Sequence, residues 1–107
     1  PLEIWATHHG LTYAGIDPSE AECIQLGIPE SFEASILKHQ GRTAESNQTR
    51  LRRSELRERE WVLRLKCLSA QNILLVVGSE HVRSLSQKLP SEGFDVEIVH
   101  EKWESTS

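Results

Sequence analysis

The clearest hydrophobic pattern in the chain is an uninterrupted aliphatic run, Ile73–Val77, with polar residues on both sides. Such a run is typical of a strand that is covered on both faces, as strands are in the parallel sheets of α/β proteins. Residues 79–89 follow with apolar positions at helical spacing, and 94–99 alternate between apolar and polar residues. Strand, helix and strand in this order predict a right-handed βαβ unit in the C-terminal third.

The first half of the chain predicts shorter elements, separated by Gly and Pro. They are, in order, a helix over 2–9, a strand over 11–16, a helix from about 18 to 27, and a helix over 29–39. Asp17 or Ser19 is placed to cap the helix that starts near residue 18. The polar stretch 40–47 predicts a mobile loop.

A long helix is predicted from about residue 44 to residue 68. Two pairs, Glu55 with Arg59 and Glu60 with Arg64, have the favourable i,i+4 orientation of a helical ion pair. Trp61 begins a stripe that continues through leucines 65 and 68. This stripe is the expected buried face of the helix, packed against the sheet.

These elements together predict a single α/β domain over residues 1–107. The expected architecture is a small two-layer or three-layer sandwich with a mainly parallel sheet of about three strands. The chain begins with Pro1 and contains no Met. Because its first residues also have the pattern of a helix interior, we expect it to be a piece of a longer protein.

Composition narrows the class of protein. Hydrophobic residues make up 37% of the chain and charged residues 26%, which is typical of a soluble globular domain. The net charge is -4, and it argues against nonspecific binding to nucleic acid or to an anionic membrane.

No apolar run reaches the roughly 20 residues that span a bilayer, and no signal peptide is visible. Cys23 and Cys67 lack a CxxC pattern and are expected to be reduced, which favours a cytoplasmic protein.

The candidate site is the turn after the aliphatic run, Gly78-Ser79-Glu80-His81. In open α/β sheets, ligands bind beyond the carboxyl ends of the strands. Gly78 would allow a sharp turn, and Ser79 could cap the following helix. His81 would lie in the first helical turn, where the helix dipole favours the neutral imidazole that a metal or a general base requires. The alternative interpretation is an ordinary capped helix with His81 on a wet rim.

Arg57 is the second candidate. It shares a helical face with Trp61 and Arg64, so it could hold a carboxylate or a phosphate group. The alternative is a set of surface ion pairs around one buried Trp. His8 and His9 are adjacent and project in different directions, so they do not form a metal pair by themselves.

The C-terminal half resembles an uncharacterised group of bacterial proteins. The residues that carry the resemblance are an RExxW helix at Arg57–Trp61 and an aliphatic strand and turn, VxGxxH, at Val76–His81. The earlier segments 13–18 and 26–28 are also similar, and the resemblance covers most of residues 11–103.

More distantly, the same order of elements is similar to the C-terminal part of the TraB/GumN-like family. Some members of that family are regarded as metal-dependent peptidases that use two GxxH motifs and an acidic residue. Only the second motif has a counterpart here, at Gly78 and His81. The segment 8–10 has its residues in the wrong order for the first motif. The resemblance implies a divalent metal at His81 only if upstream sequence completes the site.

Three functions remain open from the sequence. The first is binding of a small ligand or a metal at the Gly78–His81 turn, with Arg57 nearby. The second is a metal-dependent hydrolase or peptidase that is complete only with upstream sequence. The third is a structural or interaction module whose charged long helix packs on a partner. The expected partner is a small molecule, another protein or a second copy of the chain, and neither nucleic acid nor a membrane is expected.

Overall fold

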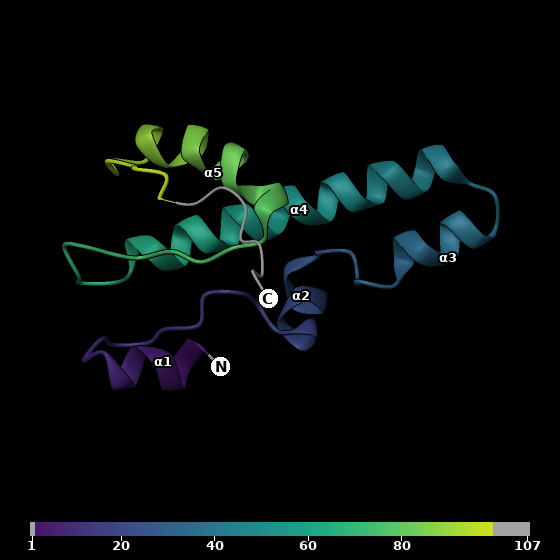
Figure 1. Ribbon diagram of the computed structural model, residues 1–107. Helices are drawn as coiled ribbons and strands as arrows, with labels where there is room; N and C mark the ends of the chain where they lie inside the picture. Colours follow the sequence, from purple (N-terminus) through teal and green to yellow (C-terminus); the bar gives the residue numbers. More distant parts are fainter. Residues whose placement is uncertain (1, 100–107) are drawn as a thin grey trace, which may run out of the picture.

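The computed structural model describes residues 2–99 of the chain. Within this part, five helices follow one another (Figure 1). They are α1 (Leu2–His8), α2 (Glu20–Leu26), α3 (Glu33–His39), α4 (Thr43–Lys66) and α5 (Ser79–Ser91). The longest, α4, runs through the middle of the molecule, and α3 and α5 pack along it.

No β-strand is found between residues 2 and 99, so the predicted α/β sandwich with a mainly parallel sheet and a βαβ unit is wrong. Two of the segments expected as strands, 11–16 and 73–77, are connections between helices, and the third, 94–99, follows α5 as a non-helical segment. Within the described part of the chain, these segments make no backbone hydrogen bonds with one another. Their backbone bonds there close the ends of helices: Leu11 donates to Ala6 after α1, and Phe94 donates to Leu89 after α5. Without a hydrogen-bonded ladder there is no sheet, however apolar the residues are.

The aliphatic run explains why the prediction failed. Leu75 and Val77 pack against the helices, whereas Leu74 and Val76 are 62% and 58% exposed. The run is therefore covered on one side only. An uninterrupted apolar sequence does not distinguish this arrangement from a strand covered on both faces.

The helices agree better with the sequence, because their ends carry clear signals. Ser19 accepts a hydrogen bond from the backbone N–H of Glu22, whose carboxylate in turn accepts one from Ser19, so α2 begins with a capping box. Gly27 ends α2 with φ at 73°, a conformation that favours glycine. The loop expected over 40–47 is shorter than predicted, because α4 already begins at Thr43.

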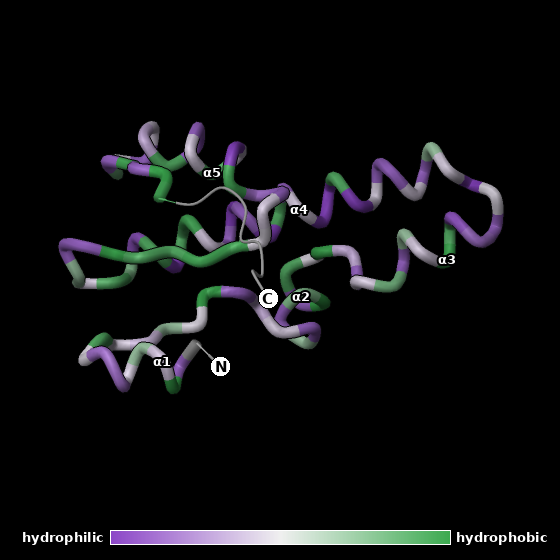
Figure 2. The backbone as a smooth tube through the Cα atoms, in the orientation of Figure 1, coloured by the Kyte–Doolittle hydropathy of each residue, from purple (hydrophilic) through white to green (hydrophobic). Residues whose placement is uncertain are grey.

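The hydrophobic core lies between α4 and α5. Its buried members are Trp61, Val62 and Leu65 from α4 and Leu85 and Leu89 from α5. Side chains from the connecting segments cover this cluster in part: Ile16, Leu68, Leu75, Val77 and Phe94. The tube in Figure 2 shows the apolar segment before α5 running beside α4. Of the predicted stripe, Trp61 and Leu65 are buried and Leu68 is partly buried, and the stripe packs against helix α5 and non-helical segments rather than a sheet.

The N-terminal half of α4 forms an antiparallel hairpin with α3 that projects away from α5 (Figure 1). Within it, the Ser46 hydroxyl donates a hydrogen bond of 2.6 Å to the carbonyl of Ala34. Arg53 donates another, also 2.6 Å, to the carbonyl of Pro29. Helix α3 contains no buried residue, so this hairpin packs closely along its length but buries little apolar surface.

Two other expectations concern single residues and membranes. Cys23 is fully buried, whereas Cys67 is exposed at the end of α4, and both are free. Across residues 2–99, no helix combines the length and the apolar character that crossing a bilayer requires. The sequence also predicts that Trp103 packs the polar C-terminal tail on the body of the molecule, but this residue lies outside the described residues.

Candidate functional site

The centre of the candidate site is a buried pair of side chains, Glu58 from α4 and His81 from α5. His81 Nδ1 lies 2.7 Å from Glu58 Oε2, and the two side chains are 6% and 4% exposed. His81 is therefore paired with an acidic side chain inside the molecule, rather than lying on a wet rim.

Two further donors from α5 surround the Glu58 carboxylate. The Ser84 hydroxyl donates to Oε1 at 2.6 Å, and the Lys88 ammonium donates to the same atom at 2.9 Å. Burial alone would raise the pKa of Glu58, but the hydrogen bonds from His81, Ser84 and Lys88 outweigh burial and hold this pKa below its usual value. Glu58 is thus an ionised carboxylate whose acceptor positions are occupied by α5.

The sequence did not single out Ser84 or Lys88. A signal for them was present, because His81, Ser84 and Lys88 follow at intervals of three and four residues and share one face of α5. The sequence does not show that Glu58 would contact this face. Glu58 lies 23 residues before His81, and the two residues meet because α4 and α5 pack together.

The turn before α5 has a simpler structure than predicted. Gly78 precedes the helix with φ at −58°, a value open to any residue, so the turn does not require glycine there. Ser79 is the first residue of α5, and no side chain caps the helix. Glu80 Oε1 is 3.7 Å from His81 Nε2, and the Glu80 side chain is 73% exposed. Of the turn residues proposed to bind a ligand, only His81 takes part in a cluster.

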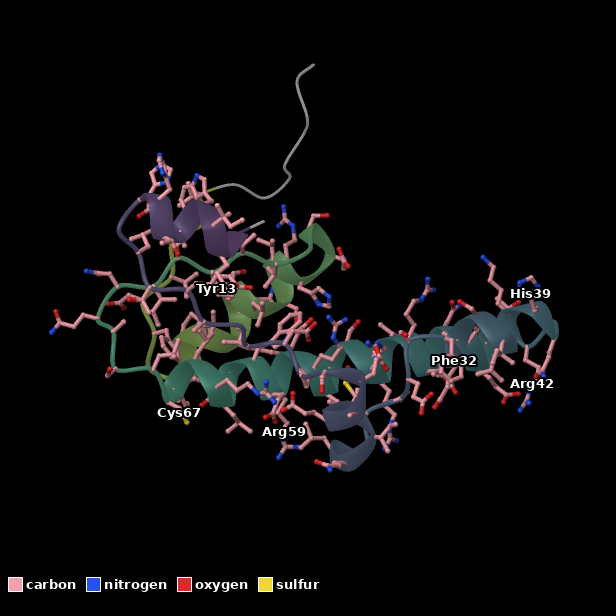
Figure 3. The ribbon with its side chains drawn as sticks, turned by 90° about the horizontal axis from the view of Figure 1, so that it is seen from below. Tyr13, Phe32, His39, Arg42, Arg59 and Cys67 are labelled. Carbon is pink, nitrogen blue, oxygen red and sulfur yellow. The ribbon has the colours of Figure 1, made fainter. Side chains whose placement is uncertain are left out.

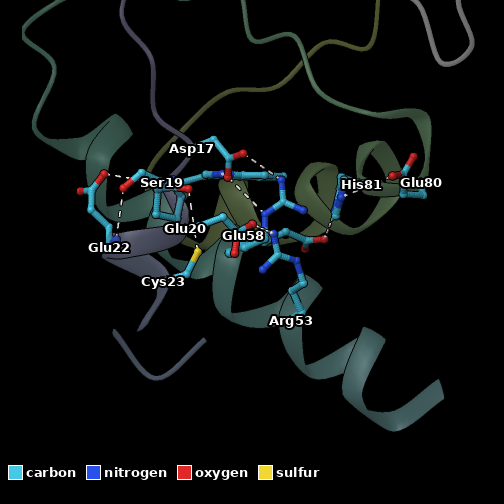
Figure 4. A network of polar contacts seen from close by, with 12 residues as sticks. Asp17, Ser19, Glu20, Glu22, Cys23, Arg53, Glu58, Glu80 and His81 are labelled. Carbon is cyan, nitrogen blue, oxygen red and sulfur yellow. Dashed lines mark hydrogen bonds and ion pairs between the residues drawn. The ribbon is translucent and has the colours of Figure 1, made fainter. Parts of the chain in front are cut away.

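Arg57 lies on the other side of Trp61 and is engaged by Asp17. Its guanidinium makes two hydrogen bonds to the Asp17 carboxylate, of 3.2 and 2.9 Å, and Trp61 Nε1 donates a third of 2.9 Å (Figure 4). The Arg57 guanidinium is also 5.1 Å from the centre of the Trp61 ring. Burial acts to raise the pKa of Asp17, but Arg57 and Trp61 together hold it below its usual value.

Trp61 joins the two charge clusters. Its ring meets the His81 imidazole edge to face, with ring centres 4.8 Å apart and planes at 78°. The predicted residues Arg57 and His81 are therefore brought to the same region, as neighbours of one Trp. Each is paired with a carboxylate of the chain itself, so neither offers its charge to a ligand.

Further ion pairs attach α2 to α4. Arg53 contacts Glu20 at 3.1 Å, and Arg64 contacts Glu22 at 2.7 Å. Arg64 also contacts Glu60 at 3.2 Å, which confirms that predicted i,i+4 pair. The other predicted pair does not form: Arg59 makes no ion pair with Glu55 or with any other residue in the described part of the chain.

No group of three or more His, Cys, Asp or Glu side chains within residues 2–99 could hold a metal ion. His81 has only Glu58 and Glu80 as acidic neighbours. His8 and His9 meet edge to face in α1, and His9 stacks on Trp5 instead of facing an acidic group. The donor set around His81 does not fit a divalent metal.

Two hollows of the surface lie away from His81 and Arg57. One of about 320 Å³ is lined by residues of α2, α3 and the connection between them, including Ile24, Ile28 and Glu33. Another, of about 370 Å³, lies against α1 beside Ile4 and His8. Both are open to solvent, and neither includes His81 or Arg57.

Comparisons with known proteins give no guidance, because no protein family, no curated protein and no solved structure matches this chain. The resemblance to an uncharacterised bacterial group, and the more distant one to the TraB/GumN-like family, therefore stay predictions. The function must be argued from the geometry of the chain itself.

Proposed function

We propose that this chain is a protein-interaction module that binds an acidic amphipathic helix of a partner protein along the solvent face of α4. The observation that carries the proposal is a stripe of two arginines and two leucines on that face. Its residues, here called the α4 stripe, are Arg52, Leu56, Arg59 and Leu63.

The spacing of the α4 stripe is that of a helix–helix interface. Its residues follow one another at intervals of four, three and four, which places them in line on one side of a helix. Leu63 is 50% exposed, and Leu56 is partly buried. Two leucines at this spacing offer the apolar contacts that a second helix packs against.

The α4 stripe lies away from the core. Glu58, Trp61 and Leu65 point from the other side of α4 toward α5 and its neighbours, so the stripe faces solvent. Figure 3 shows Arg59 on the side of α4 that is turned away from α1 and α5. A partner could therefore lie along α4 without disturbing the core.

The positive charge of the α4 stripe favours a partner with acidic side chains. Arg52 and Arg59 are exposed and pair with no acidic group between residues 2 and 99, whereas Arg53, Arg57 and Arg64 each hold a carboxylate of the chain. Arginine is enriched at protein interfaces, where it pairs with carboxylates while its stem covers apolar surface. A helix that alternates Leu with Glu or Asp complements the stripe.

A hydrolase is the second candidate, and the Glu58–His81 pair is the observation in its favour. A carboxylate that fixes the tautomer of a His is a common arrangement around a general base. However, this pair is buried, is neutralised by Lys88 and borders neither of the two surface hollows. These features favour a structural role for the pair, which holds α5 on α4.

The proposal can be tested with a designed peptide. The probe is a fluorescent amphipathic helix with Leu and Glu at the positions that would face the stripe, and the measurement is its fluorescence anisotropy on titration with the protein. We expect saturable binding, and we expect Arg59→Glu to weaken it at least about tenfold, because a like charge then opposes the peptide.

Lys38→Glu is the matched control. Lys38 is exposed on α3, away from the stripe, and the substitution changes the net charge by the same amount. The Lys38→Glu variant should bind the peptide with the same affinity as the parent protein. An unchanged anisotropy with the parent protein, or equal losses from Arg59→Glu and Lys38→Glu, would overturn the proposal.

A further inference from the structure

The outer side of the segment Leu68–Ser79 is an interaction surface of a different kind. This is the longest stretch of the chain without a charged residue or a His, in a sequence of which charged residues make up 26%. It leads from the end of α4 back along the same helix to the start of α5 (Figure 1). We infer that this segment is the contact through which two copies of the chain associate.

The segment presents apolar side chains to solvent in a fixed orientation. Leu75 and Val77 anchor it by packing against the Trp61 cluster. Leu74 and Val76 therefore point outward, and they are 62% and 58% exposed. Two neighbouring aliphatic side chains on an anchored backbone form a preorganised contact, whose ordering requires little further loss of entropy on binding.

The backbone of this segment is also available. Residues 69–77 make no hydrogen bond, from backbone or side chain, with any other described residue. An extended backbone with free donors and acceptors can add to the side-chain contact when another chain approaches.

The lack of charge in the segment Leu68–Ser79 favours a second copy of the chain as the molecule that binds there. Each copy carries a net charge of -4, so two copies repel over most of their surface. The segment Leu68–Ser79 is where they can approach without bringing like charges together. Interfaces between identical subunits are more apolar and poorer in charge than those between different proteins, whereas the α4 stripe has the charged character of a surface that selects an unlike partner.

The residues that flank the two ends of the segment have opposite charges. Lys66 lies just before it, where its ammonium also contacts the Glu92 carboxylate of the same chain, and Glu80 lies just after it; the Lys66 and Glu80 side chains are 44% and 73% exposed. In a two-fold arrangement with antiparallel segments, Glu80 of one copy approaches the Lys66 end of the other copy. A two-fold contact forms this pair twice, which favours the antiparallel arrangement.

The experiment is sedimentation velocity over a roughly hundredfold range of protein concentration, since self-association depends on concentration by mass action. We expect the parent chain to shift from monomer to dimer over this range. Leu74→Lys and Val76→Lys should each abolish the shift, because a dimer would then bring two ammonium groups together in an apolar contact. Circular dichroism checks that both variants keep the helical content of the parent.

Leu51→Lys is the control, because Leu51 is 64% exposed on α4 outside the segment and the same charge is introduced. It should dimerise like the parent. A parent chain that stays monomeric at all concentrations would overturn the inference, as would a Leu51→Lys variant that loses the dimer to the same extent as Leu74→Lys.

The orientation has its own test. Glu80→Lys should weaken the dimer, and adding Lys66→Glu to it should restore the dimer, because the exchange rebuilds both ion pairs between the copies. Lys66→Glu alone is the control for the lost contact with Glu92 within the chain, and it should weaken the dimer as Glu80→Lys does. A double variant weaker than Glu80→Lys alone would contradict the antiparallel arrangement. These results do not depend on the α4 stripe, so this inference and the proposed function can fail separately.

Discussion

Glu58 is the residue on which the packing of α4 and α5 most depends. Its carboxylate is 4% exposed and accepts from His81, Ser84 and Lys88, so three polar side chains of α5 converge on one residue of α4. A buried charge is costly unless every acceptor position is used, and here three donors supply that compensation. The sequence singled out His81 as a candidate ligand-binding residue. It did not predict the burial, because exposure depends on how the helices meet.

This arrangement predicts how stability depends on pH. The pKa of Glu58 is lowered from 4.5 in the folded chain, so its stabilising contribution is complete above the unfolded value and is lost as the pH falls through the folded pKa. Glu58→Gln removes this titration. We therefore expect a shallower decrease in the urea midpoint below about pH 5 for Glu58→Gln than for the parent.

Some acid sensitivity should remain in that variant, because Asp17 and Glu22 also have lowered pKa values. Glu55→Gln is the matched control, since Glu55 is exposed on the same helix and makes no ion pair with a described residue. Its midpoint should follow the parent at every pH. Identical pH profiles for Glu58→Gln and Glu55→Gln would show that the Glu58 cluster contributes nothing to stability.

Among the elements, the helices were predictable and the connections between them were not. Helix α2 begins at a capping box and ends at Gly27, and both are visible in the sequence. The segment 73–77 has the composition of a strand, but pairing requires partners far along the chain, and apolar composition does not show whether those partners align. The predicted i,i+4 pairs illustrate the same limit, because Glu60 binds Arg64 whereas Arg59 stays available for a partner.

Trp61 is the residue through which the connecting segments attach to α4, and we expect its loss to affect them first. It is 4% exposed, and its Nε1 donates to Asp17 in the connection before α2. Trp61→Ala should cost about 3–5 kcal/mol of unfolding free energy, as large-to-small substitutions in a core do. Trp61→Phe keeps most of the packing and loses the hydrogen bond, so it should cost about 1 kcal/mol.

Chemical denaturation measures both values. Trp5→Ala is the control, because Trp5 is 46% exposed in α1 and should change stability by no more than about 0.5 kcal/mol. Equal costs for Trp61→Ala and Trp5→Ala would mean that the cluster around Trp61 is not the core of the molecule.

The molecule as a whole leaves much apolar surface uncovered. Among residues 3–99, eight hydrophobic residues are buried, whereas sixteen large ones are exposed, among them Leu74, Leu63 and Leu51. The radius of gyration is 15.8 Å, compared with about 13 Å for a compact domain of this length. An extended shape with exposed apolar side chains is typical of a chain that buries part of its surface against partners. The α4 stripe and the segment Leu68–Ser79 are the two surfaces whose chemistry identifies such a partner.

The central claim is that the charge of the α4 stripe selects an acidic helix, and a charge reversal tests it most directly. The protein with both Arg52→Glu and Arg59→Glu is titrated with the acidic peptide and with a basic peptide in which Lys replaces each Glu. We predict that the parent binds the acidic peptide at least about tenfold more tightly than the basic one, and that the reversed protein shows the opposite preference. If the reversed protein binds the acidic peptide as tightly as the parent does, the claim is wrong.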